Sequence, residues 1–421
     1  MELREQIHER ILLHRNSTIR LLQRLVQEKS VSGNESPAQA IIIEKLREIG
    51  QSIDIWEPNY AKLQQHPFFV SPRSTFLGSS NVVGIKKGSG GGKSILLNGH
   101  IDVVPEGDTS QWEYDPYSAE VKDGMMFGRG TSDMKGGTVA LLLAIEVIND
   151  LNISLKGDII FQSVIEEESG GAGTLAAITR GYTADAAIIP EPTNMKIFPK
   201  QQGSMWFRLT VRGKSAHGGT RYEGVSAIDK SILVIKSMHD LEERRNERIN
   251  DPLYHNIPIP VPINIGKISG GSWPSTVADE VILEGRIGVA PEESMDEVKR
   301  EVERQMQSLA AQDEWFEEHP VELTWFGAKW VPGTLDLNHE ALMTLTECFE
   351  EVTKNKPVIE ASPWGTDGGL FTQVANIPTI VFGPGKTEVA HHPNEYIEID
   401  KILETAEIMV HMIVNWCNKE H

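Results

Sequence analysis

The sequence is poor in cysteine, with only Cys348 and Cys417 and no Cys-x-x-Cys pair. This scarcity excludes a disulfide framework and a cysteine-based zinc site, and we expect two buried thiols in a reducing compartment. The chain also lacks any run of about 18 uninterrupted apolar residues, which a membrane-spanning helix requires. Residues 1–15 carry many charges and no apolar stretch of the kind that forms a signal peptide. We therefore predict a cytoplasmic protein without a membrane partner.

Positive charge is also scarce, because 40 lysines and arginines stand against 60 aspartates and glutamates, a formal net charge of −20. Nucleic acids and anionic membrane surfaces bind basic patches, so neither is expected as a partner. The acidic balance is compatible with a site in which carboxylates surround cations. The length of 421 residues is sufficient for two domains.

The order of apolar segments predicts two kinds of domain. Short strands, the first at 81–86 and 94–101, alternate with helices such as 136–149, which indicates an α/β sheet layered between helices. From about residue 200 the order becomes β-α-β-β-α-β, that of a ferredoxin-like unit. The predicted fold is an α/β/α sandwich domain with an inserted ferredoxin-like α+β domain. The predicted boundaries are 1–201 and 329–421 for the sandwich and 202–328 for the insertion.

The stretch Leu96–Asp102 places two interacting polar residues just past a predicted strand. Residues two apart on a strand point the same way, so Asp102 can reach the ring of His100. A carboxylate is the usual support of a metal-binding histidine. Taken alone, the pair is better explained as a hydrogen-bonded strand end. The clusters farther along the chain change that interpretation.

Four more polar clusters follow, each at a strand end or a helix start: Asp133, the triplet Glu166–Glu168, Glu191 and the pair His391–His392. Open α/β sheets gather ligands at the carboxyl ends of their strands, so these clusters can converge. A solvated acidic turn would account for the three glutamates alone, but not for the other clusters. Imidazole and carboxylate ligands suit zinc, cobalt or manganese. Two histidines and three carboxylates would hold two divalent ions if one carboxylate bridges them.

The motifs Gly99–Asp102, Gly130–Gly137, Glu166–Glu168, Glu191–Thr193 and His391 with Glu395 occur in a specific order and spacing. With them, nearly the whole chain resembles the co-catalytic zinc amidohydrolases and metallopeptidases. That family includes acetylornithine deacetylase, succinyl-diaminopimelate desuccinylase, aminoacylase and glutamate carboxypeptidase. The resemblance implies metal-dependent hydrolysis of the amide bond of a small N-acyl amino acid. It also implies two Zn²⁺ ions, for which Co²⁺ or Mn²⁺ can substitute.

The resemblance assigns a role to each site residue. The implied metal ligands are His100 and Glu191 on one ion, Glu168 and His391 on the other, and Asp133 as the bridge. Asp102 would orient His100, and Glu167 would be the general acid/base. The family more often has Asp-Glu-Glu, so Glu166 departs from its pattern, although Gly170-Gly171 support the chosen register.

The inserted domain carries further matching positions. His217 resembles the histidine that the dimerising domain of the family offers to the neighbouring active site, which implies a homodimer through this domain. Asn264 and Arg286 match positions that hold the substrate carboxylate, but Arg286 alone could equally form a surface ion pair. In the second part of the sandwich, Thr366 looks like a substrate contact. Trp364 stands where the family commonly has a small residue.

The substrate is less well defined than the reaction class. Our best single prediction is acetylornithine deacetylase, which converts N-acetyl-L-ornithine and water into L-ornithine and acetate. The alternatives are a desuccinylase of succinyl-diaminopimelate, a dipeptidase or carboxypeptidase, and a deformylase of a small heterocyclic amine. A non-catalytic binding protein belongs to another class, and the intact Glu167 argues against it.

Overall fold

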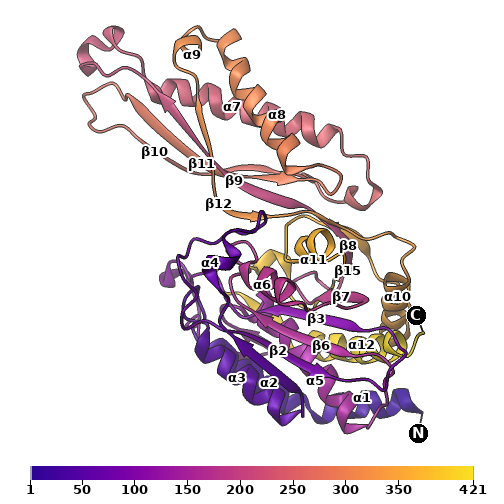
Figure 1. The fold of residues 1–421 in the computed structure, drawn as a ribbon. Coiled ribbons are helices and arrows are strands. Elements are labelled where there is room, and N and C mark those ends of the chain that lie inside the picture. Colours follow the sequence, from indigo (N-terminus) through magenta and orange to yellow (C-terminus); the bar gives the residue numbers. More distant parts are fainter. Residues whose placement is uncertain (1, 421) are drawn as a thin grey trace. The chain divides into compact units, whose positions relative to one another are not determined.

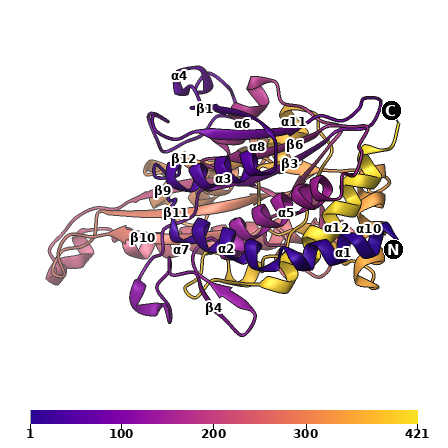
Figure 2. The same ribbon diagram turned by 90° about the horizontal axis from the view of Figure 1, so that it is seen from below.

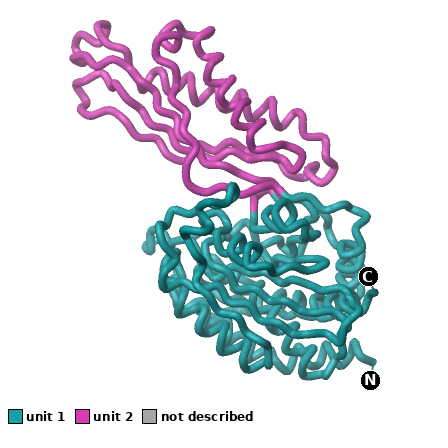
Figure 3. Tube along the Cα trace, in the orientation of Figure 1, with its two compact units in different colours: residues 1–200, 333–362, 366–421 teal, residues 201–332, 363–365 magenta. Residues whose placement is uncertain are grey.

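The computed structural model describes residues 2–420, which form two compact units that we describe one at a time (Figures 1 and 3). Unit 1 comprises Met1–Lys200, Gly333–Ser362 and Thr366–His421, and unit 2 comprises Gln201–Pro332 with Pro363–Gly365. The predicted insertion ended earlier, at residue 328, and did not include 363–365. The difference arises because strand β12 (Glu322–Trp330) continues past its apolar pattern through a β-bulge after Phe326.

Unit 1 is organised around a nine-stranded mixed sheet in the order β1-β2-β6-β3-β7-β15-β8-β13, with β14 beside β8. The central strands β6, β3, β7 and β15 run parallel to one another. Such strands are buried on both faces, which is why β3 is apolar without alternation. The strands span Ser52–Trp56 (β1), Asn81–Lys86 (β2), Ile95–His100 (β3), Ile159–Val164 (β6), Ala186–Ile189 (β7), Ile197–Gln201 (β8), Gly333–Thr334 (β13), Ile359–Ser362 (β14) and Thr379–Val381 (β15).

Helices cover both faces of this sheet (Figures 1 and 2). One layer contains α1 (Leu3–Leu13), α2 (Arg15–Gln27), α3 (Ser36–Glu48), α5 (Gly136–Asp150) and α12 (Ile399–Cys417), with α10 (Glu340–Thr353) against α12. The other face carries α6 (Ala172–Arg180) and α11 (Gly368–Val374). Helix α5 is apolar on nearly every side because it lies between the sheet and its neighbours α2 and α12. None of the helices in residues 2–420 has the length and apolarity to span a bilayer.

A small second sheet of unit 1, in the order β16-β5-β4, joins distant parts of the chain. It consists of β4 (Glu120–Lys122), β5 (Met125–Phe127) and β16 (Tyr396–Glu398). Strand β5 leads into the loop that carries Asp133, and β16 follows the loop that carries His391. Their antiparallel pairing therefore brings these two loops to the same place.

Unit 2 has the predicted β-α-β-β-α-β order, and its four antiparallel strands lie in the order β10-β11-β9-β12. The elements that accompany β12 are β9 (Gly203–Arg212), α7 (Ala227–Glu247), β10 (Ile263–Gly270), β11 (Glu280–Val289), α8 (Met295–Gln307) and the short α9 (Trp315–Glu318). Alternate strand residues such as Phe207 and Leu283 form a core with Val234 of α7 and Val298 of α8. The residues between them, at period two, face the side of the sheet away from this core.

Gly137, in the first turn of α5, packs against the loop that follows β7. A Cβ atom at this position would lie 2.0 Å from the carbonyl oxygen of Pro190. We expect Gly137→Ala to lower the free energy of unfolding by about 1–3 kcal/mol, because the helix must move away from rigid backbone. Chemical denaturation measures this. The control is Gly266→Ala, where the nearest atom is the flexible Nδ2 of Asn264 at 3.3 Å. Equal stabilities of the two variants would contradict the prediction.

Candidate metal centre

Three neighbouring parallel strands bring polar side chains to one edge of the unit 1 sheet. His100 is the last residue of β3, Glu167 and Glu168 follow β6, and Glu191 follows β7. Because β6, β3 and β7 are adjacent in the sheet, the residues that follow them meet. Asp133 arrives from the loop before α5, and His391 from the loop before β16.

Asp133 directs its two carboxylate oxygens at two different histidines. Its Oδ1 lies 3.1 Å from His100 Nε2, and its Oδ2 lies 3.2 Å from His391 Nε2. A carboxylate that bridges two metal ions needs this arrangement, with one oxygen and one imidazole for each ion. The geometry therefore fits a shared ligand.

The remaining donors divide between the two histidines. Glu191 Oε2 lies 3.8 Å from His100 Nε2, and Glu168 Oε2 lies 3.1 Å from His391 Nε2. Possible ligand atoms of His100, Asp133 and Glu168 all lie within 4.8 Å of one another, and so do those of His100, Glu167 and Glu191. The short distances pair Glu191 with His100 and Glu168 with His391, and Asp133 lies near both histidines. His392, the alternative histidine, contributes its backbone carbonyl oxygen to Arg129 at 3.4 Å.

The clustered carboxylates carry negative charge that cations or protons must compensate. Burial raises the pKa of Glu191 to about 7 and holds the pKa of Glu167 well above its usual range. The Glu168 carboxylate raises the pKa of His391 to about 12. Without metal, protons therefore compensate the clustered carboxylates, and divalent ions that bind these donors must displace protons. Imidazole and carboxylate donors in this number fit two such ions.

Asp102 supports the site differently from the sequence expectation. The ring nitrogen Nδ1 of His100 lies 2.8 Å from the backbone carbonyl oxygen of Asp102 and 3.7 Å from its carboxylate. The carboxylate instead accepts hydrogen bonds from the backbone amides of Glu167 at 3.2 Å and Glu168 at 3.1 Å. The prediction assumed that side chains two residues apart on a strand point the same way. Strand β3 ends at His100, so this rule does not apply to Asp102. Asp102 fixes the His100 ring through its backbone and the glutamate turn through its side chain.

Glu166, the residue that departs from the family pattern, serves a structural network. Its side chain is fully buried, accepts a hydrogen bond from Ser71 Oγ at 2.7 Å and lies 3.5 Å from Arg73. Arg73 also pairs with the buried Glu35 at 3.1 Å. Both Ser71 and Arg73 belong to the long connection between β1 and β2, which contains the short helix α4 (Tyr60–Leu63). This connection is therefore tied to the residue that precedes Glu167.

Glu395 and Arg129 join the two loops that carry Asp133 and His391. The buried Glu395 carboxylate accepts hydrogen bonds from the backbone amides of Gly130 at 2.9 Å, Ser132 at 2.8 Å and Asp133 at 3.0 Å. It also accepts one from Arg129 Nη1 at 2.8 Å. The sequence motif contains Glu395, but only the fold shows that it holds the backbone of Asp133.

Asp367 is a buried carboxylate that the sequence analysis did not single out. It accepts a hydrogen bond from Thr174 Oγ1 at 2.6 Å, and burial raises the pKa of Asp367 to about 6. Thr366, the predicted substrate contact, is also buried, and its Oγ1 accepts a hydrogen bond from the Gly368 amide at 3.0 Å. The sequence pattern that could have indicated Asp367 is an aspartate directly before Gly368 and Gly369, the first residues of α11.

Three predicted site residues belong to unit 2. His217 is exposed, and its Nδ1 accepts a hydrogen bond from the Gly219 amide at 3.0 Å, which leaves the proton of the neutral ring on Nε2. Asn264 and Arg286 are directly opposed on strands β10 and β11. The structure thus brings Asn264 and Arg286 together on one sheet.

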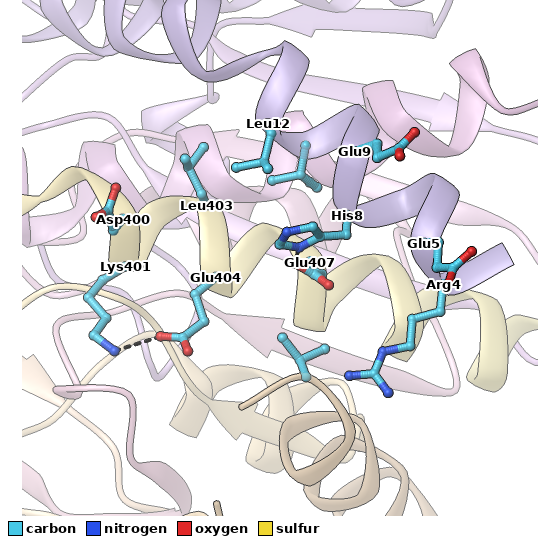
Figure 4. A pocket seen from close by; sticks show the side chains of 12 residues that line it. Arg4, Glu5, His8, Glu9, Leu12, Asp400, Lys401, Leu403, Glu404 and Glu407 are labelled. Atoms are coloured by element: carbon cyan, nitrogen blue, oxygen red, sulfur yellow. Dashed lines mark hydrogen bonds and ion pairs between the residues drawn. The ribbon is translucent and has the colours of Figure 1, made fainter. Parts of the chain in front are cut away.

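A cavity of about 880 Å³ lies elsewhere in unit 1, between α1, α12 and the end of α10 (Figure 4). Two pairs form among its charged side chains, His8 with Glu407 at 2.9 Å and Lys401 with Glu404 at 2.6 Å. None of the five ligand candidates lines it. We therefore place the chemistry at the strand ends and not in this cavity.

Comparison with known proteins finds similarity along nearly the whole chain. A family model described as peptidase family M20/M25/M40 matches residues 96–415. The chain is 33% identical to the N-formyl-4-amino-5-aminomethyl-2-methylpyrimidine deformylase of Halalkalibacterium halodurans, with 97% of each chain covered. It is 27% identical to the acetylornithine deacetylase of Edwardsiella ictaluri, with 79% of this chain and 82% of that protein covered.

A solved structure supports the fold. A tripeptidase from Staphylococcus aureus matches with a TM-score of 0.73 at 24% identity, covering 96% of this chain and 99% of that chain. At this level of identity the match bears on architecture alone. Together with the sheet orders of the two units, it confirms the predicted fold class.

Neighbouring glutamates are expected to differ in function. Glu167→Ala should keep the metal content and lose most of kcat, on the order of the 10²–10⁴ typical of a general acid/base. Glu168→Ala should lower the metal content, because Glu168 faces His391. Metal analysis of the purified variants, beside steady-state kinetics, makes the distinction. The opposite pattern would show that the register of the triplet is wrong by one residue.

Glu395→Gln is expected to weaken metal binding by about 10- to 100-fold, the range seen when the support of a ligand is removed. The new amide group must face backbone N–H donors, so the loop of Asp133 loses its fixed position. Titration calorimetry of the metal-free protein with Zn²⁺ measures the effect. Glu388→Gln is the matched control, since Glu388 is exposed and accepts a hydrogen bond from the side chain of Asn194 and not from backbone of the metal site in residues 2–420. Equal affinities in the two variants would assign Glu395 to folding alone.

Proposed function

The chain belongs to peptidase family M20/M25/M40, and from this premise we propose that it removes a formyl group from a small heterocyclic amine. Membership makes the protein a metal-dependent hydrolase that acts on amide bonds. The proposed substrate is N-formyl-4-amino-5-aminomethyl-2-methylpyrimidine. Hydrolysis gives formate and the free aminomethylpyrimidine.

One observation carries this choice of substrate. The deformylase relative is similar over 97% of both chains at 33% identity, so the similarity includes the inserted unit as well as the metal centre. The acetylornithine deacetylase relative, our best prediction from sequence, covers 79% of the chain at 27% identity. We keep acetylornithine deacetylation as the second candidate, since the metal-ligand motifs are compatible with either substrate.

Each residue of the proposed active site has its own role in the hydrolysis. Two divalent ions held by the five ligands would acidify a water molecule and polarise the formamide carbonyl. Glu167 takes a proton from the attacking water and returns it to the leaving nitrogen, a role that suits its raised pKa. Asp102 holds the turn of Glu167 through the backbone amide. The Nε2 proton of His217 stabilises the developing oxyanion.

We propose zinc as the native ion, with cobalt or manganese as substitutes, because imidazole and carboxylate donors suit all three. A cytoplasmic location is the accompanying proposal. It is supported by Cys348 and Cys417, which are both buried and unpaired.

We further propose a homodimer through unit 2, in which His217 serves the active site of the partner. Strand β10 is an open edge of its sheet, and α7 packs beside it. On these two elements Ile228, Ile232 and Ile268 are 50%, 60% and 59% exposed. An open strand edge beside exposed apolar side chains is typical of a surface that pairs with another chain.

The substrate proposal predicts a clear preference. The zinc-loaded protein should hydrolyse the N-formyl aminopyrimidine with a kcat/KM at least about 100-fold above that for N-acetyl-L-ornithine, a difference of about 2.7 kcal/mol in transition-state binding. Chelation should abolish the activity, and added Zn²⁺ or Co²⁺ should restore it. Formate release and amine release are measured separately. A preference for N-acetyl-L-ornithine would replace the first candidate by the second.

The dimer proposal predicts complementation between two inactive variants. His217→Ala and Glu167→Ala are unfolded, mixed equally and refolded, so that half of the dimers are mixed if pairing is random. In each mixed dimer one site combines an intact Glu167 with an intact His217 from the other chain, so about a quarter of all sites should regain activity.

Ile232→Asp is the companion variant and should give a monomer in sedimentation. Leu77→Asp is its control and should remain a dimer, because Leu77 is also exposed, at 79%, but belongs to unit 1 and not to the proposed dimer surface. A refolded mixture without activity, in which mixed dimers are demonstrated, would contradict the assignment of His217 to the partner.

A further inference from the structure

Glu35 and Glu166 are two fully buried carboxylates of unit 1 that are not proposed metal ligands. Glu35 directly precedes α3, and Glu166 follows β6 as the first residue of the glutamate triplet. The exposed fraction of each side chain is 0%. A buried carboxylate is costly unless a cation or hydrogen-bond donors compensate it, so both side chains need partners.

The connection between β1 and β2 supplies these partners. Arg73 serves both carboxylates, because its Nη1 lies 3.1 Å from Glu35 and 3.5 Å from Glu166. Ser71 Oγ donates a hydrogen bond to Glu166 at 2.7 Å. Ser79 Oγ donates one to Glu35 at 2.6 Å. Each carboxylate therefore has a serine of its own, and the guanidinium links the two.

An aromatic cluster anchors the connection beside Arg73. Phe76 is only 1% exposed, and the guanidinium carbon of Arg73 lies 5.2 Å from the centre of its ring. Tyr60 and Phe69 pack against Phe76 with ring centroids 5.7 and 6.3 Å away. The backbone amide of Arg73 also donates a hydrogen bond to Ser71 Oγ at 3.1 Å. The arginine is therefore held both at its backbone and at its planar group.

Glu166 carries its buried side chain on an unfavourable backbone. Its φ of 62° lies in the left-handed region, which a residue with a Cβ atom keeps only where its surroundings hold it there. The contacts of its carboxylate provide this hold. Asp102 separately fixes the next two residues, Glu167 and Glu168, through their backbone amides. The turn that carries Glu167 is therefore held at two points, and one of them is the Glu166 side chain.

The Glu167 carboxylate has little freedom to move without consequence. One of its oxygens and possible ligand atoms of His100 and Glu191 all lie within 4.8 Å of one another. A displacement of about 1 Å at a reacting group can lower a rate on the order of 100-fold. Because Glu166 and Glu167 are consecutive, a change in the backbone conformation of Glu166 displaces Glu167 directly.

We propose that Glu166 is a positioning residue for Glu167, and that Ser71 and Arg73 of the connection keep it in place. The connection contributes no proposed metal ligand, but its hydroxyl and guanidinium groups hold Glu166 in the left-handed conformation and so fix the direction of the general acid/base. Aspartate, which the family more often has at position 166, is one methylene shorter and would draw its carboxylate back from both donors. The assignment rests on the proposed role of Glu167 in hydrolysis.

A purely structural role for this network makes a different prediction. If the network only compensates buried charge, loss of either serine hydroxyl should lower stability and leave kcat unchanged. If it positions Glu167, only the hydroxyl bound to Glu166 should affect kcat. The two serines are well matched, because each carboxylate keeps one further donor, Ser32 Oγ for Glu166 and the Gly33 amide for Glu35.

The test compares Ser71→Ala with its control Ser79→Ala, using N-formyl-4-amino-5-aminomethyl-2-methylpyrimidine as substrate at saturating Zn²⁺. Ser71→Ala should lower kcat about 5- to 50-fold and change KM by less than about threefold, because a general acid/base acts in the transition state. Ser79→Ala should leave both constants within about threefold of the parent values. Glu166→Asp should reproduce the loss seen in Ser71→Ala, and Ser71→Thr, which keeps the hydroxyl, should retain most of kcat.

Hydrogen exchange of the metal-free protein, followed by mass spectrometry, gives a readout that does not depend on turnover. The peptide over residues 165–171 contains the hydrogen-bonded amides of Glu167, Glu168, Gly170 and Gly171. These amides should exchange at least about fivefold faster in Ser71→Ala, because the turn opens more often. In Ser79→Ala they should exchange as in the parent protein. Melting curves verify that each variant is folded, and the metal content of each is measured.

Two outcomes would overturn the assignment while the proposed function stands. Equal kcat values for Ser71→Ala and Ser79→Ala would assign the network to stability alone. A loss of kcat in Ser71→Ala that follows its metal content would mean that the turn supports Glu168 and not Glu167. The proposed function fails separately, if the parent protein hydrolyses neither the pyrimidine formamide nor N-acetyl-L-ornithine. Hydrogen exchange then still decides whether Ser71 holds the turn.

Discussion

Repulsion among buried carboxylates is the constraint on which the rest of unit 1 depends. Acidic side chains from β3, β6, β7 and the loop before α5 meet at one sheet edge, where burial makes unpaired charge costly. The structure responds in two ways. Carboxylates that lie near imidazoles form a group whose negative charge bound cations would neutralise. Carboxylates outside that group accept hydrogen bonds from backbone N–H groups. The backbone hydrogen bonds of Asp102 and Glu395 belong to this second response.

These backbone contacts also determine how the two halves of the centre are joined. The two carboxylate oxygens of Asp133 lie 3.1 Å from His100 Nε2 and 3.2 Å from His391 Nε2. A small shift of the Asp133 loop would therefore bring the carboxylate closer to one histidine and farther from the other. Glu395 prevents such a shift because it belongs to the segment of His391 and binds the amide of Asp133. The pairing of β5 with β16 holds the same two segments a few residues away. Two loops far apart in sequence thus behave as one rigid support.

Much of the site could be predicted from the sequence because its ligands follow strands, and strands that end together place their next residues together. The proposed metal-ligand pairs around Asp133 follow from that rule and from the family resemblance. The role of the Asp102 side chain could not be predicted from the sequence, since it depends on the residue at which strand β3 ends and its side chains stop alternating between the two faces. The role of Glu395 could not be predicted either, because it arises from contacts with residues more than two hundred positions earlier. The β-bulge that lengthens β12 moved a domain boundary, and it leaves little mark in the apolar pattern.

The interrupted order of unit 1 has a consequence for how the chain matures on the ribosome. Unit 2 is nearly contiguous, whereas the unit 1 sheet pairs β7 with β15, and helix α5 packs on α12. Translation therefore completes nearly all of unit 2 while β7 of the unit 1 sheet still lacks its neighbour β15. His391 is synthesised after all of the other proposed ligands. In the proposed two-ion arrangement, a nascent chain would already carry His100 and Glu191, whereas the ligand set around His391 would stay incomplete until synthesis approaches its end.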